Sequence, residues 1–428
     1  MYYFMATNYL LLALYLLLCW WLVPRIPFVK NAGITQKEAR LLFSFKIVVG
    51  LLLAFYFTYF SFNFDYLGYN AEGMVEYQLL KENPRQFFNG FSGYLHTYGA
   101  GHIFETSNSA WGYFRFILLF KLIAIADLVT QGNFYFNTAI FSTVIFFGHL
   151  AFYRVYRQIY PGQKFTVLVA TFLLPSLLLY TACIDKDGLI FISIAVACHI
   201  FHRFVSLPKN HVAVKNGLLF LVALAIIFLF RNYVLVAMLP AMLIGMLCKW
   251  LPFKKRYTVL VAYAVFFLLF FLSGFSDAWY NLPAAVVQRK ADFAALGPGN
   301  TGIAMNELHP SAQSFLYNLP QAINHYFMRP YLWEFRQRSV LLTAIELLFY
   351  QVIILLFIFY RKKPSAHLHP FNIFGLAFVF NMMLIVGYII PNVGAIVRYR
   401  SIFWVFIVCP ALCNIDWQRL LPFGTKRN

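Results

Sequence analysis

Long apolar runs constrain this chain more than any other feature of its sequence. The stretch "YTVLVAYAVFFLLFFLSG" at 257–274 is apolar on every side of a helix, and comparable runs recur along the whole chain. About 20 such residues cross the hydrocarbon core of a bilayer as a helix, whereas the strands of a membrane barrel alternate over about ten residues. Because hydrocarbon offers the backbone no hydrogen-bonding partner, each run must satisfy its own N–H and C=O groups. The runs therefore predict membrane-spanning α-helices.

Composition agrees with this interpretation. The chain is 61% hydrophobic and 11% charged, whereas soluble domains are about 25% charged. We predict an all-α polytopic transmembrane bundle of about 11–12 helices, built as a single membrane domain over residues 1–428. The predicted spans lie near residues 5–23, 41–62, 111–130, 134–153, 165–183, 189–204, 216–230, 233–249, 257–274, 340–360, 371–390 and 401–417.

The distribution of charge predicts which connections share a side of the membrane. One group of connections carries 21 Lys and Arg and comprises 24–46, 154–164, 203–215, 249–256, 361–370 and 418–428. A second group carries 10 Lys and Arg against 11 acids and comprises 63–110, 183–188, 275–339 and 391–400. Since Lys and Arg are enriched in cytoplasmic loops, we place the first group in the cytoplasm and the second outside. The net charge of +19 then reflects topology, and it does not indicate nucleic-acid binding.

Two of the outer stretches, 63–110 and 275–339, are large loops in which we expect short interfacial helices. The run at 111–130 is the weakest predicted span because it carries Arg115, Lys121 and Asp127. It is compatible with a re-entrant segment, a helix on the membrane surface or a helix packed inside the bundle. Counting it as non-spanning gives eleven crossings, which we prefer.

Metal and redox signals are weak. The six cysteines include no CxxC pair, so the sequence indicates neither a zinc site nor a disulfide framework. We predict no metal site and no cofactor, and the sequence leaves a requirement for a divalent cation open.

Carboxylates follow the second predicted span. Asp65 stands at the start of 63–110, and Glu72 and Glu76 lie four residues apart on one face of a predicted amphipathic helix. Pro84 either ends that helix or starts a second one. A carboxylate held at the membrane surface can act as a general base on a hydroxyl. We therefore take Asp65 and Glu72 as candidate catalytic residues, the alternative being a solvated loop with an ordinary helix cap.

Cations gather on the same predicted side. Arg231 interrupts about 35 otherwise apolar residues. An arginine within a membrane span usually lines a cavity or pairs with an anion. The alternative is a side chain that snorkels to the membrane surface at a tight turn between two helices. Arg398 and Arg400, with Gly394 before them, suggest a compact anion-binding turn. The candidate substrate-binding residues are Lys186, Asp187, Arg231, Arg329, Arg398 and Arg400.

Two groups of motifs resemble known families. An outer acidic residue just after a helix, followed by interfacial helices as in "FDYLGYNAEGMVEYQLL", resembles GT-C integral membrane glycosyltransferases. That resemblance implies that Asp65 acts as the base or orients the acceptor beside a lipid-linked donor. The short loop in "PSLLLYTACIDKDG" and the late "VRYR" resemble O-antigen polymerase-like bacterial polysaccharide proteins. This second resemblance implies that Lys186, Arg231, Arg398 and Arg400 bind a lipid pyrophosphate.

The expected function is the transfer of sugar from a polyprenyl-phosphate- or polyprenyl-pyrophosphate-linked donor to a glycan or other hydroxyl acceptor. We expect the protein in a bacterial inner membrane, in contact with lipids, with its active face extracytoplasmic. One alternative is a transporter or flippase of a lipid-linked saccharide or another anionic substrate, for which inverted repeats and broken helices are typical. A third is a non-catalytic scaffold of an envelope complex.

Overall fold

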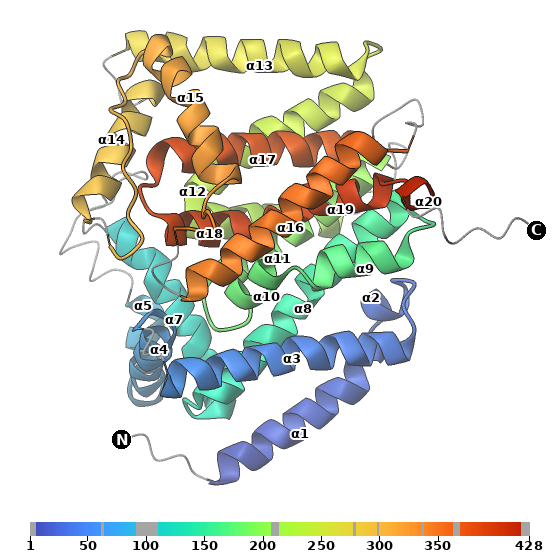
Figure 1. Cartoon of the computed structure of the whole chain (residues 1–428). Helices are drawn as coiled ribbons and strands as arrows, with labels where there is room; N and C mark the ends of the chain where they lie inside the picture. Colours follow the sequence, from blue (N-terminus) through green and yellow to red (C-terminus); the bar gives the residue numbers. More distant parts are fainter. Residues whose placement is uncertain are drawn as a thin grey trace, which may run out of the picture. The chain divides into compact units, whose positions relative to one another are not determined.

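The structure, a computed structural model, is helical throughout the part of the chain that it describes (Figure 1). Apart from two isolated β-bridges, the described residues form no strand pairing, which confirms the all-α class. Eight of their helices are long and apolar enough to cross a membrane, or up to nine if one bent pair is a single span. The chain is therefore an integral membrane protein. The described residues are 6–60, 64–90, 110–206, 214–276, 280–297, 299–334, 338–362 and 369–420.

Backbone contacts divide the chain into two compact units, and three long helices contribute residues to both. Unit 1 consists of Met1–Val155, Leu177–His199 and Ala213–Asn232, and unit 2 of Tyr156–Ser176, Ile200–Val212 and Tyr233–Asn428. The shared helices are α8 (Phe134–Ile159), α11 (Lys186–Ser206) and α12 (Val214–Trp250).

Unit 1 also holds α1 (Ala6–Leu22), α2 (Pro27–Lys30), α3 (Gln36–Tyr59), α4 (Phe64–Glu82), α5 (Pro84–Asn89), α7 (Ala110–Thr130) and most of α10 (Pro175–Tyr180). Unit 2 also holds α9 (Lys164–Phe172), α13 (Lys255–Leu272), α14 (Leu282–Ala295), α15 (Ala312–Phe327), α16 (Arg338–Tyr360), α17 (Pro370–Ile389), α18 (Val393–Ser401), α19 (Val405–Asn414) and α20 (Trp417–Leu420).

Local sequence explains where several helices begin. Thr35 and Glu38 form a capping box at the start of α3, in which the Thr35 N–H donates to Glu38 over 2.7 Å. Asn83 caps α5, and Pro84 occupies its first turn, where a missing N–H costs nothing. Pro84 thus begins a second helix, which settles the alternative left open by the sequence.

Three predicted spans differ from the structure. Residues 165–183 form two short helices, α9 and α10, because Pro175 follows a non-helical pair of leucines. The helix α7, which forms from 111–130 and carries three charges, is not among the helices apolar enough to cross a membrane. It packs against α4. Residues 401–417 are not one straight span, since α18 and α19 meet at a bend of 62°.

The long helix α12 is interrupted at the predicted position. Arg231 has non-helical backbone angles (φ −149°, ψ 79°), with 17 helical residues before it and 19 after it. An unbroken helix of 37 residues would be about 56 Å long, nearly twice the thickness of the hydrocarbon core. The break therefore leaves two segments, each close to the length of one crossing.

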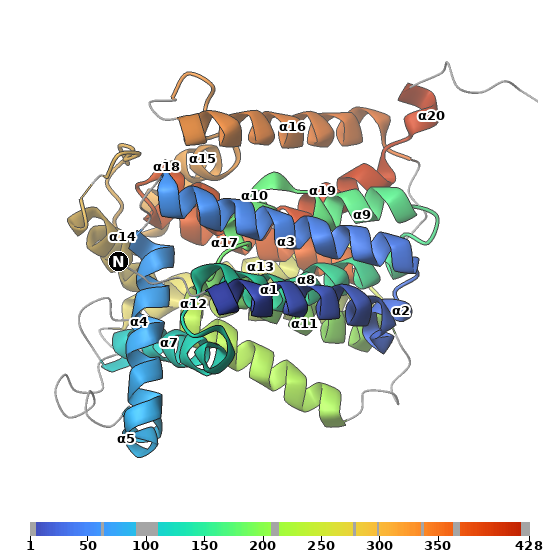
Figure 2. The ribbon, with the colours of Figure 1, turned by 90° about the horizontal axis from the view of Figure 1, so that it is seen from below.

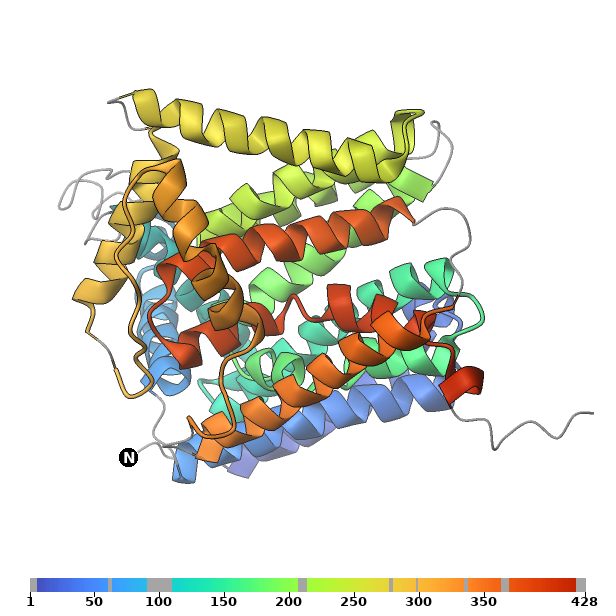
Figure 3. The same ribbon diagram turned by 45° about the horizontal axis from the view of Figure 1, so that its top comes forward.

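Both large loops predicted to lie outside contain helices: α4 and α5 in the first, and α14 and α15 in the second. In unit 1, α4 runs crosswise to α1 and α3, as Figure 2 shows. In unit 2, α15 crosses α17 and packs against it (Figures 1 and 3). These arrangements agree with helices that lie along a membrane surface, as the sequence predicted for both loops.

Several contacts within each unit join residues in or near connections of one predicted group. In unit 1, Arg154 near the end of α8 lies over the Phe28 ring at 4.4 Å, so two connections of the basic group meet. In unit 2, the Tyr160 hydroxyl accepts hydrogen bonds from Asn372 (2.8 Å) and Asn414 (3.1 Å). At the opposite predicted side, Thr301 donates to Asn392 over 2.8 Å.

The crossing of α15 and α17 generates a test of packing. A Cβ atom on Gly387 would lie 2.4 Å from the backbone carbonyl oxygen of Ala322, and backbone cannot move aside as a flexible side chain can. We expect Gly387→Ala to lower the free energy of unfolding by about 1–3 kcal/mol, measured by thermal unfolding in detergent. Gly217→Ala, where a Cβ meets nothing within 4 Å, is the matched control, and equal stability of the two variants would contradict the packing.

Candidate functional site

The predicted residues fall in both units. Unit 1 contains Asp65, Glu72, Lys186, Asp187 and Arg231, while unit 2 contains Arg329, Arg398 and Arg400. Each group is described within its own unit.

The centre of the unit 1 site is a buried ion pair. Asp187 in the first turn of α11 pairs with Arg231 at the break in α12. Asp187 is 0% exposed and Arg231 is 5% exposed. Removing two such charges from water costs several kcal/mol for each ion, and only close pairing with further hydrogen bonds offsets that cost. The pair therefore compensates the Arg231 charge within the chain, and it fixes α11 beside the break.

A second buried acid and a cation flank this pair. Asp185 is 0% exposed and ends the turn that leads into α11. Lys186 is half-buried, and its Nζ atom lies 4.9 Å from the centroid of the Phe116 ring of α7, within range of a cation–π interaction. The site thus combines two carboxylates and two cations at one end of α11.

Aromatic contacts connect Lys186 to α4. The Phe116 ring that lies under Lys186 also lies 6.3 Å from the ring of Tyr69. Tyr69 follows Asp65 by four residues, so the two residues are neighbours on one face of α4. Lys186 and Tyr69 therefore lie near the same ring, Phe116, and Asp65 lies one turn before Tyr69 on α4.

Both candidate catalytic carboxylates are exposed on α4. Asp65 lies in the first turn, and Glu72 lies two turns later on the same face. Glu76, one turn further, instead pairs with Lys121 of α7 over 3.1 Å. Lys121 also donates to the Phe87 carbonyl of α5, so this pair holds α4, α5 and α7 together.

The α4 helix is also fixed at its middle. Asn70 donates to the Gly132 carbonyl over 3.0 Å, and Asn137 donates to Asn70 over 2.9 Å. Asn137 donates as well to Asp127 over 2.6 Å. This buried network joins α4 to the turn between α7 and α8, so the helix that carries Asp65 is anchored to the bundle of unit 1.

The three unit 2 arginines have different surroundings. Arg398 and Arg400 lie in the last turn of α18, and not in the compact anion-binding turn that the sequence suggested. Residues two apart on a helix face different ways, and Arg400 is buried and donates to the Tyr326 carbonyl, whereas Arg398 is half-buried. The Nε atom of Arg329 lies 3.2 Å from the Glu334 carboxylate.

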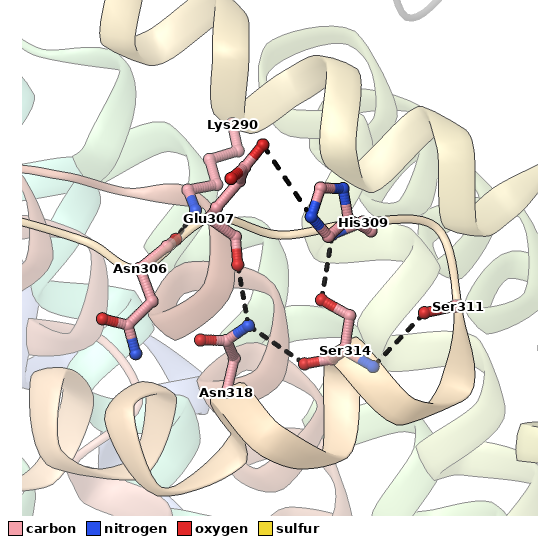
Figure 4. A network of polar contacts seen from close by, with 7 residues as sticks. All are labelled: Lys290, Asn306, Glu307, His309, Ser311, Ser314 and Asn318. Atoms are coloured by element: carbon pink, nitrogen blue, oxygen red, sulfur yellow. Dashed lines mark hydrogen bonds and ion pairs between the residues drawn. The ribbon is translucent and has the colours of Figure 1, made fainter.

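The connection between α14 and α15 is organised by polar contacts (Figure 4). Lys290 of α14 donates to the Asn306 carbonyl, and Asn318 of α15 donates to the Glu307 carbonyl over 3.0 Å. The N–H of His309 donates to Ser314 over 2.9 Å. The loop is thereby tied to both of its flanking helices.

Sequence reasoning missed one buried cation. Lys46 was counted with the basic connection 24–46, but the structure places it eleven residues into α3, at 1% exposure. The signal was present, since Lys46 is the only charge in the run "LLFSFKIVVGLLLAFYF". The same argument that singled out Arg231 applies to it.

Comparison with known proteins adds no assignment. No protein-family profile matches the chain, and no curated protein or solved structure is significantly similar to it. Among the described residues, no group of three or more His, Cys, Asp or Glu side chains has the arrangement of a metal site.

The buried ion pair generates a stability test. Asp187→Asn leaves the Arg231 charge without its carboxylate, so we expect the free energy of unfolding to fall by about 3–5 kcal/mol. The double variant Asp187→Asn with Arg231→Met should recover part of that loss in detergent unfolding. Asp292→Asn breaks the partly exposed contact with Arg289 at 3.9 Å and should cost less than about 1 kcal/mol. A double variant no more stable than Asp187→Asn would argue against the pairing.

His325 predicts a dependence of stability on pH. Burial in α15, together with the nearby Arg329 and Lys290 charges, lowers the pKa of His325 to about 4. Between about pH 6.5 and about pH 4, the unfolded chain therefore binds a proton at His325 that the folded protein does not bind. The free energy of unfolding falls as the pH drops through this range, by at most about 1.4 kcal/mol per pH unit. We expect His325→Gln to flatten this part of a melting-temperature profile. An unchanged slope would show that another group is responsible.

Proposed function

We propose that the chain is a membrane glycosyltransferase or polysaccharide polymerase that uses a polyprenyl-phosphate- or polyprenyl-pyrophosphate-linked sugar. The observation that supports the proposal most is that Lys186 lies over Phe116, which contacts Tyr69 one turn after Asp65 on α4, and that Lys186 is adjacent in the chain to the buried Asp187–Arg231 pair. A carboxylate such as Asp65 on α4 and a cation such as Lys186 at the start of α11 are groups of the kind that sugar transfer from a lipid phosphate requires. The charge distribution favours the extracytoplasmic face of a bacterial inner membrane.

In this proposal, Asp65 is the base that takes a proton from the acceptor hydroxyl. It is exposed, as a group that meets an incoming acceptor must be, and its helix is anchored through Asn70 and Glu76. Glu72 lies on the same face and extends the acidic surface toward the acceptor.

Lys186 is the cation that we assign to the phosphate leaving group. A fixed positive charge stabilises the negative charge that develops as the sugar–phosphate bond breaks. Arg231 supports Lys186 indirectly, because its pairing with Asp187 fixes the first turn of α11. In unit 2, the predicted binding residues are Arg329, Arg398 and Arg400, of which Arg329 contacts Glu334 and Arg400 contacts Tyr326.

A transporter or flippase is the second candidate, and the break of α12 at Arg231 favours it. Discontinuous helices with charged residues at the break are typical substrate sites of transporters. The two functions differ in outcome: in reconstituted vesicles, a transporter moves the lipid-linked saccharide without covalent change, whereas a transferase produces a new glycosidic bond.

The transferase proposal predicts that Asp65→Asn lowers sugar transfer by roughly 100-fold or more, as expected when a general base is lost. Transfer would be measured as surface glycan in cells and as conversion of a lipid-linked sugar by purified protein, with protein amounts matched. Lys186→Met should also reduce transfer.

Glu82→Gln is the matched control, because Glu82 is an exposed acid at the end of the same helix but on a different face. It should transfer sugar at the normal rate. Normal transfer in both Asp65→Asn and Lys186→Met would overturn the proposal.

A further inference from the structure

Lys46 is a charged residue inside a membrane-spanning helix. It lies in α3, whose 24 residues are apolar enough to cross the membrane, and its side chain is buried in unit 1. A charge at such a position is costly, and it is usually retained for a function. The question is what the Lys46 ammonium contacts there.

The ammonium binds the end of the short helix α10. Its Nζ atom donates to the Thr181 carbonyl over 2.9 Å, to the Thr181 hydroxyl over 2.8 Å and to the Leu178 carbonyl over 3.4 Å. The last carbonyls of a helix have no partner within the helix, and they carry the negative end of its dipole. Lys46 therefore satisfies oxygen atoms that hydrocarbon would leave without partners.

Two further contacts hold the same turn against α3 and α8. Ser142 of α8 donates to the Ala182 carbonyl over 2.6 Å, and the Cys183 thiol lies 3.8 Å from the Gly50 carbonyl. Gly50 is required by this close approach, because a Cβ there would lie 2.6 Å from the Ser142 hydroxyl and 3.1 Å from the Ala182 carbonyl. Three consecutive residues, 181–183, are thus fixed from two sides.

The fixed turn leads directly into the candidate site. Asp185, Lys186 and Asp187 follow it within four residues, so any movement of the turn changes where α11 begins. A displacement of about 1 Å in a catalytic group is enough to cost roughly 100-fold in rate.

We infer that Lys46 is a positioning residue, which acts through the turn at 181–183 to hold Lys186 and the Asp187–Arg231 pair in place. This inference rests on the proposed function. It adds Lys46 to the proposed site as a residue that lies inside a membrane span and contacts no substrate.

Cys183 offers a direct measurement of the turn. It is 1% exposed and lies within the segment that Lys46 holds. In a full-length chain whose other five cysteines are replaced by alanine, N-ethylmaleimide should label Cys183 slowly. Lys46→Met removes all three donated hydrogen bonds, and we expect it to accelerate labelling roughly tenfold, because the turn opens locally.

Companion variants separate this role from a general loss of stability. Lys46→Arg keeps a donor and should restore both protection of Cys183 and sugar transfer. Ser142→Ala removes one contact from the other side of the turn without affecting a charge, and it should give an intermediate labelling rate even if Lys46→Met folds poorly. Lys121→Met removes another buried lysine of unit 1, which pairs with Glu76, and should leave Cys183 protected.

The outcomes distinguish the inference from the proposed function. Unchanged labelling in both Lys46→Met and Ser142→Ala would overturn the positioning role, whatever the protein does. Faster labelling with normal sugar transfer in Lys46→Met, while Asp65→Asn abolishes transfer, would overturn the inference and leave the proposed function standing. Faster labelling with reduced transfer, restored by Lys46→Arg, is the expected result.

Discussion

The structure depends on the requirement that charge buried away from water be compensated by the protein itself. Water is absent there, so a buried ion without a partner would be more costly than most single interactions can offset. Asp187 and Arg231 meet this requirement by pairing with each other. Lys46 meets it in another way, through the oxygen atoms at the end of α10. The ion pair lies at the first turn of α11 and Lys46 binds the turn that precedes it, so the compensation of charge is built into the surroundings of the candidate site.

Polar contacts also hold the helices of the two large loops. In unit 1, the pair formed by Glu76 and Lys121 and the network of Asn70, Asn137 and Asp127 attach α4 to the helices beside it. In unit 2, α15 is attached to α17 by the hydrogen bond from the Tyr388 hydroxyl to the Phe315 carbonyl (2.7 Å). Polar side chains therefore attach the helices of these loops to their neighbours, whereas the spans are held mainly by apolar packing.

Much of the fold could be predicted from the sequence, because apolar runs and the bias of Lys and Arg report directly on the membrane. The break at Arg231, the crosswise helix after Asp65 and the start of a helix at Pro84 all follow from local signals. The number of spans was less predictable. The run at 165–183 is apolar enough to cross, but Pro175 and the partners available to the ends of α10 favour two short helices. For the site, the sequence identified Asp187 and Arg231 as separate candidates, and only the structure shows that they pair. Lys46 was overlooked because a basic residue near the end of a basic connection resembles a topology signal.

The crosswise direction of α4 has a consequence for any substrate that is part lipid. Successive turns of a helix that lies along a bilayer remain at one depth, whereas those of a spanning helix move about 5.4 Å deeper with each turn. If α4 lies along the membrane surface as the sequence predicts, Asp65 and Glu72, two turns apart on it, are at one depth, and the proposed function places them in the layer of the head groups. In the proposed function, such a site would bind the head group at a fixed distance from the hydrocarbon, whatever the number of isoprene units beneath it.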